Sequence, residues 1–306
     1  MSQKFSIKLF NRYTQNEEVE LVYGQESIEF AYNSLLGKAL APVIGSRLLS
    51  QIYGSFQDKE SSGKKVPQFL KDFNINTSDY ENGSIENVEF KDSFKSFNEF
   101  FIRKFKEGRR EFIQDTNILS AFAEARYYGY EKLTEDFRAP VKGYELSAEK
   151  LLENKSLAKD FIGGPVMIAR LCPVDYHRYH YPDSGVTSKN YLIKGDFHSV
   201  NPLALLHRKD IFVKNERRVS ILETENFGKI AYIEVGATCV GKIIQSFDES
   251  KPFKRGDEKG YFLFGGSTVI VLGEAGKWSP SSDILLNTKK GIETYIHLGD
   301  EVGTKI

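Results

Sequence analysis

Alternating apolar and polar positions near the start of the chain predict a β-hairpin over residues 5–23. From residue 27 to residue 56 the apolar side chains instead recur at intervals of three and four, which is the spacing of one helix face. This second stretch carries few charges on its polar side. Two interpretations of it stay open: a buried helical hairpin, or an interfacial segment that lies on a membrane.

A capping box predicts a helix that starts after Ser96, because Glu99 stands three residues later. The aromatic residues that follow are expected in the core: Phe97, Phe100, Phe101 and Phe105. A basic run comes next and is typical of a solvated face, with contact to a phosphate as the alternative: Arg103, Lys104, Lys106, Arg109 and Arg110.

After about residue 115 the pattern changes to short β-like runs separated by Gly, Pro and Asp. Only residues 147–154, capped by Ser147, are expected to be helical in this part. The pattern therefore predicts an α+β fold, in which a mainly helical N-terminal region, 1–115, precedes a β-rich catalytic body, 116–306.

Composition adds few constraints. The 42 Lys and Arg residues balance 42 Asp and Glu residues, so no global field favours nucleic acid. The two cysteines, Cys172 and Cys239, lie in apolar runs and are expected to be buried thiols. The first residues lack an apolar h-region, so no secretory signal is expected, and no window holds 18 uninterrupted apolar residues.

Gly265-Gly266-Ser267-Thr268, between an aromatic run and a β-branched run, is the first candidate for chemistry. Alone it predicts a tight turn between strands. Two glycines also permit backbone conformations that bring a following serine hydroxyl onto the preceding carbonyl. Such a serine could cut its own chain.

The densest polar cluster, residues 172–182, contains His177 and His180. Zinc binding is disfavoured, because no matching Cys/His pair stands at metal spacing elsewhere. Two interpretations remain for these histidines: structural roles in a loop, or a base of near-neutral pKa that activates a serine.

Together these segments resemble the phosphatidylserine decarboxylase family. Asp175-Tyr-His-Arg-Tyr-His-Tyr-Pro182 is similar to its D-Y-H-R-x-H-x-P motif, and Gly266-Ser267-Thr268 to its G-S-T self-cleavage site. Further segments of the chain agree with the family in the same order: 94–104, 141–152, 199–204 and 235–241.

The resemblance implies that His180 deprotonates Ser267, whose oxygen attacks the carbonyl of Gly266. An N-to-O acyl shift and an elimination would then cut the chain and convert residue 267 into a covalent pyruvoyl cofactor. The products would be a β chain, 1–266, and an α chain, 267–306, held together without a covalent link. The sequence leaves open any higher oligomer.

The pyruvoyl carbonyl would form a Schiff base with phosphatidylserine, and loss of carbon dioxide would give phosphatidylethanolamine. His180 would donate the proton to the resulting carbanion. His177 is a further candidate, either as a contact to the substrate phosphate or carboxylate, or only as a brace for the loop. No metal is implied.

One residue departs from the family pattern. Where the family has an aspartate that orients the histidine, this chain has Glu124, and Phe122 replaces the preceding proline. Either the backbone accommodates the extra methylene, or maturation is slow or absent. Retained activity is the prediction. The alternatives are an unprocessed lipid-binding relative and a pyruvoyl decarboxylase of another amino-acid-like substrate.

A phospholipid substrate also implies a place for the enzyme. The resemblance predicts peripheral association with the cytoplasmic side of the cell membrane, where phosphatidylserine lies in the bilayer. Residues 27–56 are the best candidate for the contact, through their apolar face plus Lys38 and Arg47.

Overall fold

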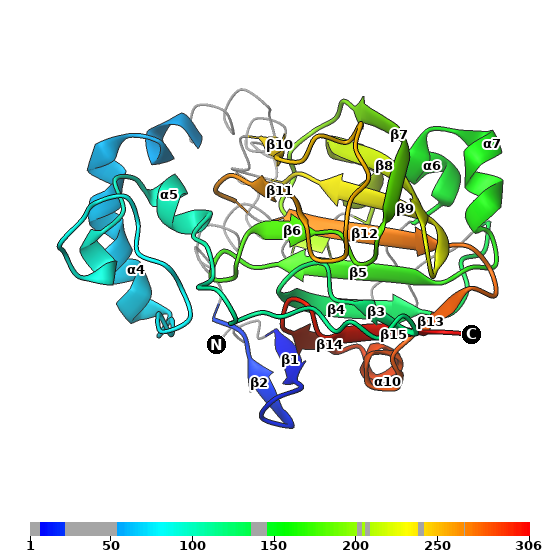
Figure 1. The fold of residues 1–306 in the computed structure, drawn as a ribbon, viewed down its shortest axis with the longest axis horizontal. Helices are drawn as coiled ribbons and strands as arrows, with labels where there is room; N and C mark the ends of the chain where they lie inside the picture. The colour runs from blue at the N-terminus through cyan, green and yellow to red at the C-terminus, as the bar shows by residue number, and fades with distance from the viewer. Residues whose placement is uncertain are drawn as a thin grey trace, which may run out of the picture.

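A large mixed sheet forms the centre of the molecule (Figure 1). The computed structural model describes residues 7–21, 54–135, 146–200, 204–205, 209–237, 242–265 and 267–306. In these residues the sheet has nine strands, in the spatial order β2 (Asn16–Val19), β1 (Lys8–Asn11), β14 (Glu293–Ile296), β4 (Ala125–Tyr130), β5 (Val166–Leu171), β12 (Ser267–Gly273), β9 (Gly228–Val235), β8 (Arg217–Thr224) and β7 (Gly185–Ile193). Neighbours are antiparallel except β1 and β14.

Two smaller sheets and several short helices complete the described structure. One sheet has the order β10 (Ile243–Gln245), β11 (Glu258–Phe262), β6 (Arg178–His180), and the other β13 (Trp278–Pro280), β15 (Glu301–Lys305), β3 (Ile118–Ser120). The α-helices are α4 (Val66–Asp72), α5 (Phe97–Phe101), α6 (Ala148–Leu152), α7 (Lys155–Ala158), α9 (Ile211–Lys214) and α10 (Ser282–Lys290). The 3₁₀ helices are η1 (Glu60–Lys65), η2 (Phe90–Asp92) and η3 (Lys159–Phe161). The α+β prediction is confirmed.

The middle of the large sheet is buried on both faces. Every residue of β4, β5 and β12 is buried, which explains why these strands read as continuous apolar or aromatic runs and not as alternating ones. Their side chains belong to one extended core that also includes Trp278 and Phe122. A strand in such a position has little freedom to shift its register.

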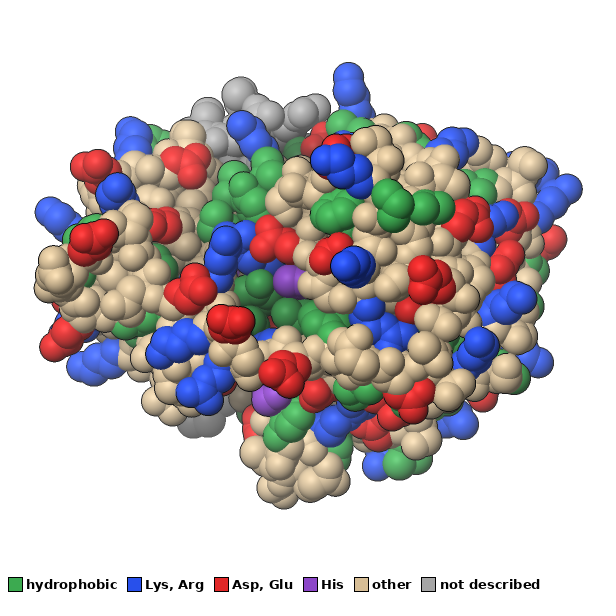
Figure 2. Space-filling model, in the orientation of Figure 1, with side chains coloured by type: hydrophobic (Ala, Val, Ile, Leu, Met, Phe, Trp, Pro, Cys, Tyr) green, Lys and Arg blue, Asp and Glu red, His purple; other side chains and the backbone are tan. Residues whose placement is uncertain are grey.

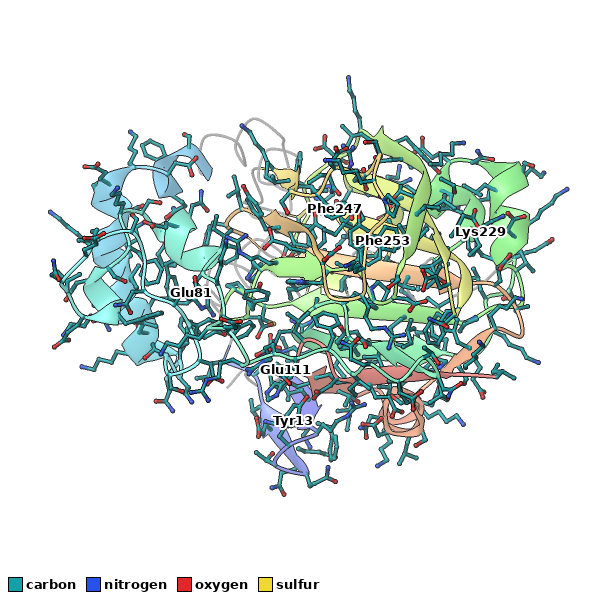
Figure 3. All side chains as sticks on the ribbon, viewed as in Figure 1. Tyr13, Glu81, Glu111, Lys229, Phe247 and Phe253 are labelled. Carbon is teal, nitrogen blue, oxygen red and sulfur yellow. The ribbon has the colours of Figure 1, made fainter. Side chains whose placement is uncertain are left out.

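The predicted N-terminal hairpin is confirmed, and it joins the large sheet through β14. Tyr13, labelled in Figure 3, lies in its turn and stacks on His297, with 3.6 Å between ring centroids. This contact fixes the hairpin against the residue that follows β14. The division of the chain at residue 115 remains a prediction.

The helices α4 and α5 lie to the side of the sheet (Figure 1) around a separate group of buried side chains, here called the aromatic cluster: Val66, Phe69, Phe94, Phe97, Phe100, Phe101 and Phe264. The predicted Ser96 N-cap is confirmed, since the Glu99 N–H donates to Ser96 Oγ at 3.1 Å, while the Glu99 carboxylate accepts from the N–H groups of Lys95 and Ser84. The Ser147 cap is confirmed too, at the start of α6. Most of the predicted segment 27–56 lies outside the described residues, which include only its last three.

The expectation of a solvated basic face after α5 is wrong for Arg103. This side chain is 2% exposed and lies over the rings of Tyr80 and Phe100, at 4.4 and 4.7 Å. It donates to the carbonyl of Val174 at 2.8 Å. Among the helices described, none is both long and apolar enough to cross a membrane.

Candidate active site

Ser267 is the first residue of β12, at the centre of the large sheet. It stands opposite Leu171 of β5, and its side chain is fully buried. No hydrogen-bond partner lies within reach of its Oγ in the described part of the chain. Gly265 has φ +145°, a backbone conformation that L side chains rarely adopt, so the bend before the serine requires glycine here. Gly266 itself lies outside the described residues.

His180 lies on β6 with both ring nitrogens engaged. Nδ1 is 2.9 Å from the Gly256 carbonyl, and Nε2 is 3.2 Å from the Tyr176 hydroxyl. Because a carbonyl only accepts, Nδ1 carries the proton and Nε2 presents its lone pair to the hydroxyl. Burial lowers the pKa of His180 below the ordinary value of 6.5. The ring is therefore neutral at pH 7, the state that a general base requires.

His177 lies deeper than His180. Its ring packs on Phe101, with 3.7 Å between centroids, and its Nδ1 is 3.0 Å from the Asp175 carbonyl. Burial lowers the pKa of His177 to about 3. The backbone of Gly265 lies near the ring and partly offsets this effect, because it raises the pKa. Its Nε2 has no partner in hydrogen-bond geometry among the described residues. The structure thus brings His177 beside Gly265, two residues before Ser267.

The Glu124 side chain is 3% exposed, and its hydrogen bonds go to residues other than the predicted partner, His180. Its carboxylate accepts hydrogen bonds from the Arg110 guanidinium at 2.6 and 3.1 Å and from the Tyr295 hydroxyl at 3.0 Å. The Leu298 N–H adds a longer contact at 3.3 Å. His180 is not among its hydrogen-bond partners, so an orienting role for Glu124 stays a prediction.

The alternative carboxylate, Asp175, is also committed elsewhere. It accepts from Arg126 and from the backbone N–H of Cys172.

A pocket of about 270 Å³ connects His180 with the surroundings of Glu124. It is lined by Lys104, Phe105, Lys106, Glu107, Gly108, Arg110, Phe112, Tyr176, His180, Gly256, Glu258 and Leu298. Figure 2 shows a histidine in a depression of this face, bordered by acidic and basic side chains. The pocket therefore joins a neutral imidazole to a wall that carries three cationic side chains and two carboxylates, and Ser267 is not among its lining residues.

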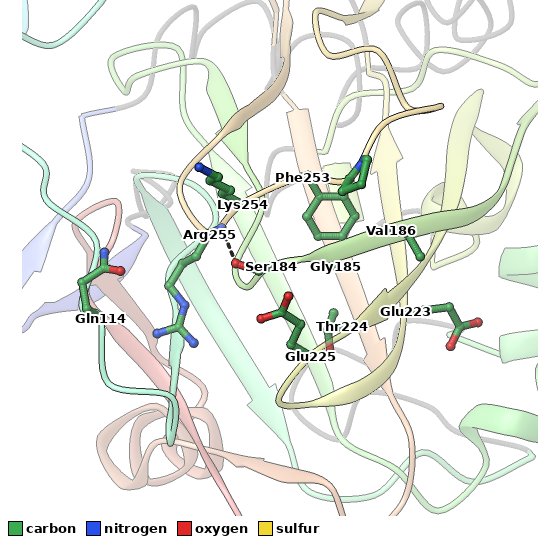
Figure 4. A pocket seen from close by; sticks show the side chains of 11 residues that line it. Gln114, Ser184, Gly185, Val186, Glu223, Thr224, Glu225, Phe253, Lys254 and Arg255 are labelled. Carbon is green, nitrogen blue, oxygen red and sulfur yellow. Dashed lines mark hydrogen bonds between the residues drawn. The ribbon is translucent and has the colours of Figure 1, made fainter.

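A larger pocket, about 680 Å³, lies where β7 begins and β8 ends (Figure 4). Ser184, Gly185, Phe253 and Arg255 are among its lining residues, and the Arg255 N–H donates to Ser184 Oγ at 3.2 Å. No site residue predicted from the sequence lines it. Its size alone does not make it the reactive site.

A buried ionic network next to Ser267 was missed by the sequence analysis. Arg170 stands opposite Thr268 on β12 and opposite Arg126 on β4. The Arg170 guanidinium contacts Glu20 at 2.7 Å and Glu293 at 2.8 Å, and Arg126 contacts Glu20 at 2.8 Å. The only signal in the sequence is an arginine inside each of two strands that are otherwise apolar or aromatic.

Comparisons with known proteins agree on one family. A family model described as phosphatidylserine decarboxylase matches residues 97–304. The chain is 40% identical over 301 residues to a phosphatidylserine decarboxylase proenzyme of Clostridium novyi (strain NT), covering 98% of this chain and 100% of the relative. Proenzymes of the same name from Clostridium kluyveri and Clostridium perfringens (strain ATCC 13124) are each 40% identical over 300 residues, covering 98% of this chain and 99% and 100% of theirs.

Proposed function

This chain belongs to the phosphatidylserine decarboxylase family, and we propose that it cuts itself before Ser267 and then converts phosphatidylserine to phosphatidylethanolamine. The observation that carries the proposal is Ser267 itself. A buried hydroxyl without a partner follows a glycine pair at the head of the central strand. Other buried side-chain atoms of the described residues also lack a partner, Thr268 Oγ1 among them, so what supports Ser267 as the nucleophile is its missing partner together with its place directly after the glycine pair.

In the first step the Ser267 hydroxyl proton passes to a neutral histidine, His180, and Oγ attacks the carbonyl carbon of Gly266. The His180 ring would have to exchange its Tyr176 contact for Ser267, because both of its nitrogens are engaged elsewhere in the structure. The peptide C–N bond breaks, its nitrogen takes a proton, and an ester remains. Loss of the Cα proton of residue 267 then expels the Gly266 carboxylate. Addition of water with release of ammonia leaves a pyruvoyl group at the new N-terminus. The lowered pKa of His180 supports its role, because the base is unprotonated at neutral pH.

The second reaction would use the pocket beside His180. A pyruvoyl group at position 267 would supply an electrophilic carbonyl that withdraws electrons from the carbon losing carbon dioxide. His180, on the pocket wall, would hold and deliver the proton that replaces the carboxyl group. Lys104 and Lys106, on the same wall, would attract the phosphate of a phospholipid.

Denaturing gel electrophoresis tests the self-cleavage. Residues 267–306 are 40 of the 306 residues in a 34.8 kDa chain, so we expect bands of about 30 and about 4.5 kDa. A single intact band after long incubation would favour the alternative of an unprocessed lipid-binding relative. Mass spectrometry of the lipid product separates phosphatidylethanolamine formation from action on another amino-acid-like substrate.

Shortening Glu124 tests whether this chain has adapted to its longer carboxylate. Aspartate cannot keep the contacts to Arg110, Tyr295 and Leu298 together, and a misplacement of about 1 Å can reduce a rate about 100-fold. We therefore expect Glu124→Asp to slow scission by between about 10- and 100-fold, measured as loss of the full-length band with time.

The matched control is Asp79→Asn, which removes the other and more exposed carboxylate on Arg110 and should leave the rate near that of the unaltered chain. Faster scission in Glu124→Asp would instead show that the extra methylene is a handicap.

The proposal also covers the assembly of the two fragments and the location of the enzyme in the cell. The two fragments, 1–266 and 267–306, would stay associated without a covalent link, and the enzyme would bind peripherally to the cytoplasmic side of the cell membrane. Support for this place comes from the phospholipid substrate implied by the family. The apolar segment 27–56 remains the predicted contact.

A further inference from the structure

The residues just before the candidate cleavage site leave the sheet and enter the aromatic cluster between α4 and α5. Phe264, three residues before Ser267, is 3% exposed. Its ring centroid lies 5.1 Å from that of Phe97 and 5.0 Å from that of Phe101, in edge-to-face or tilted contacts. A residue of the segment between β11 and β12 is thus packed into the N-terminal helices.

The backbone of Phe264 is held as firmly as its ring. Its N–H donates to the side-chain oxygen of Asn98 at 2.8 Å, across 166 positions of sequence. The same amide donates through Nδ2 to Asp58 at 2.6 Å. Asn98 is 3% exposed and lies on α5 between the buried rings of Phe97 and Phe100. A buried amide in such apolar surroundings is costly unless its hydrogen bonds are made, and here both ends are used.

The position of this contact matters because Gly265 and Gly266 have no side chains to restrict them. The carbonyl of Gly266 must meet Ser267 Oγ, and only its two flanks can place it there. On one side β12 is fixed in the centre of the sheet. On the other side the backbone of Gly265 lies beside the His177 ring, and the first packed side chain is that of Phe264. Without that anchor the glycine pair would sample many conformations in which attack cannot occur.

We propose that Asn98 and Phe264 are positioning residues for self-cleavage, which hold the glycine pair so that the Gly266 carbonyl faces the serine. This inference rests on the self-cleavage proposed above. Neither residue takes part in proton transfer or bond breaking. They act through the geometry of the segment between them and Ser267.

The test follows cleavage of freshly refolded full-length chains over time on denaturing gels. Asn98→Ala removes the acceptor for the Phe264 N–H, and we expect scission at least about tenfold slower. Asp58→Ala removes the shorter of the two contacts that Asn98 Nδ2 makes, to Asp58 and to the Gly54 carbonyl at 3.5 Å, but leaves the acceptor, so its rate should stay within about threefold of the unaltered chain.

A charge-swapped pair supplies the rescue. In the double variant N98D/D58N the aspartate at 98 still accepts from Phe264, and the asparagine at 58 donates to it in turn. We expect this variant to cleave within about threefold of the unaltered rate. The apparent pKa of the pH–rate profile should be the same in all variants, because the proton-transfer groups are untouched.

Hydroxylamine cleaves esters, so it shows whether a variant is slow in forming the ester or in the later elimination. It should not restore scission of Asn98→Ala, because the defect lies in ester formation. Three results would each overturn the inference. They are scission of Asn98→Ala at the rate of the unaltered chain, a slowing in Asp58→Ala as large as that in Asn98→Ala, and a double variant that cleaves as slowly as Asn98→Ala. If Asn98→Ala fails to fold, Phe264→Leu takes its place, with the same tenfold slowing expected and an unchanged rate as the contrary result. An unaltered chain that never cuts would instead contradict the proposed function.

Discussion

Replacing Ser267 by alanine should leave a single 34.8 kDa polypeptide with no decarboxylase activity. The variant lacks both the nucleophile and the precursor of the pyruvoyl group, so the catalysed reaction falls to its uncatalysed rate, a loss of at least about 10⁶-fold. The fold should not suffer. Ser267 Oγ has no hydrogen-bond partner among the described residues, so its removal leaves no new unpaired group, and stability should change by less than about 1 kcal/mol.

Two measurements check this expectation: the band pattern on a denaturing gel and the release of carbon dioxide from phosphatidylserine vesicles. Thr268→Val is the matched control, since its Oγ1 is equally buried and equally without a partner but belongs to the next residue. This control should still be cut. Scission of the Ser267→Ala chain would mean that the nucleophile lies elsewhere.

Replacing Arg170 by methionine should destabilise the protein by about 3–5 kcal/mol. The substitution leaves the buried carboxylates of Glu20 and Glu293 without their shared guanidinium. Urea unfolding in the Ser267→Ala background measures the effect on one uncut chain, for which a single unfolding free energy is defined. Lys229→Met is the control (Lys229 is labelled in Figure 3), because its ion pair with Asp160 is partly exposed and should contribute at most about 1 kcal/mol.

The effect of the Arg170 substitution should shrink in acid. Burial alone would raise the pKa of Glu20, but Arg170 and Arg126 overcome burial and lower it from 4.5 to about 2. A carboxylate with a lowered folded-state pKa stabilises the fold above pH 4.5 and loses that contribution as the pH falls towards 2. The gap between the two proteins should therefore be largest near neutral pH and smaller at pH 3. A gap that does not change with pH would mean that lost packing, and not lost charge pairing, causes the destabilisation.

Local patterns in the sequence predicted part of the local structure. The Ser96 N-cap and the N-terminal hairpin are confirmed, because capping, turn formation and alternation depend on residues a few positions apart. The expectation that only residues 147–154 are helical after residue 115 is wrong, since α7, α9 and the nine-residue α10 also lie there. The sequence also located Ser267 after a backbone bend that requires glycine, with Gly265 at φ +145°.

Contacts between distant segments could not be predicted in this way. The bond from Phe264 to Asn98 joins residues 166 positions apart, and nothing in either neighbourhood specifies the other. Arg103 was expected in solvent because its neighbours in sequence are charged, yet it is buried against Tyr80 and the loop that contains Val174. Periodicity shows which face of an element is apolar, and does not show which other element covers it.

The position of β12 and β14 in the large sheet has a consequence for the proposed two-chain enzyme. Residues after 266 supply β12, which lies between β5 and β9, and β14, which lies between β1 and β4. The shorter fragment would therefore be interleaved with the longer one, and the core around the large sheet would be built from both fragments. The serine could react only after β5 and β9 of the longer segment have assembled on either side of β12. Scission would then act as a quality check on assembly, since a misassembled chain would never acquire its cofactor.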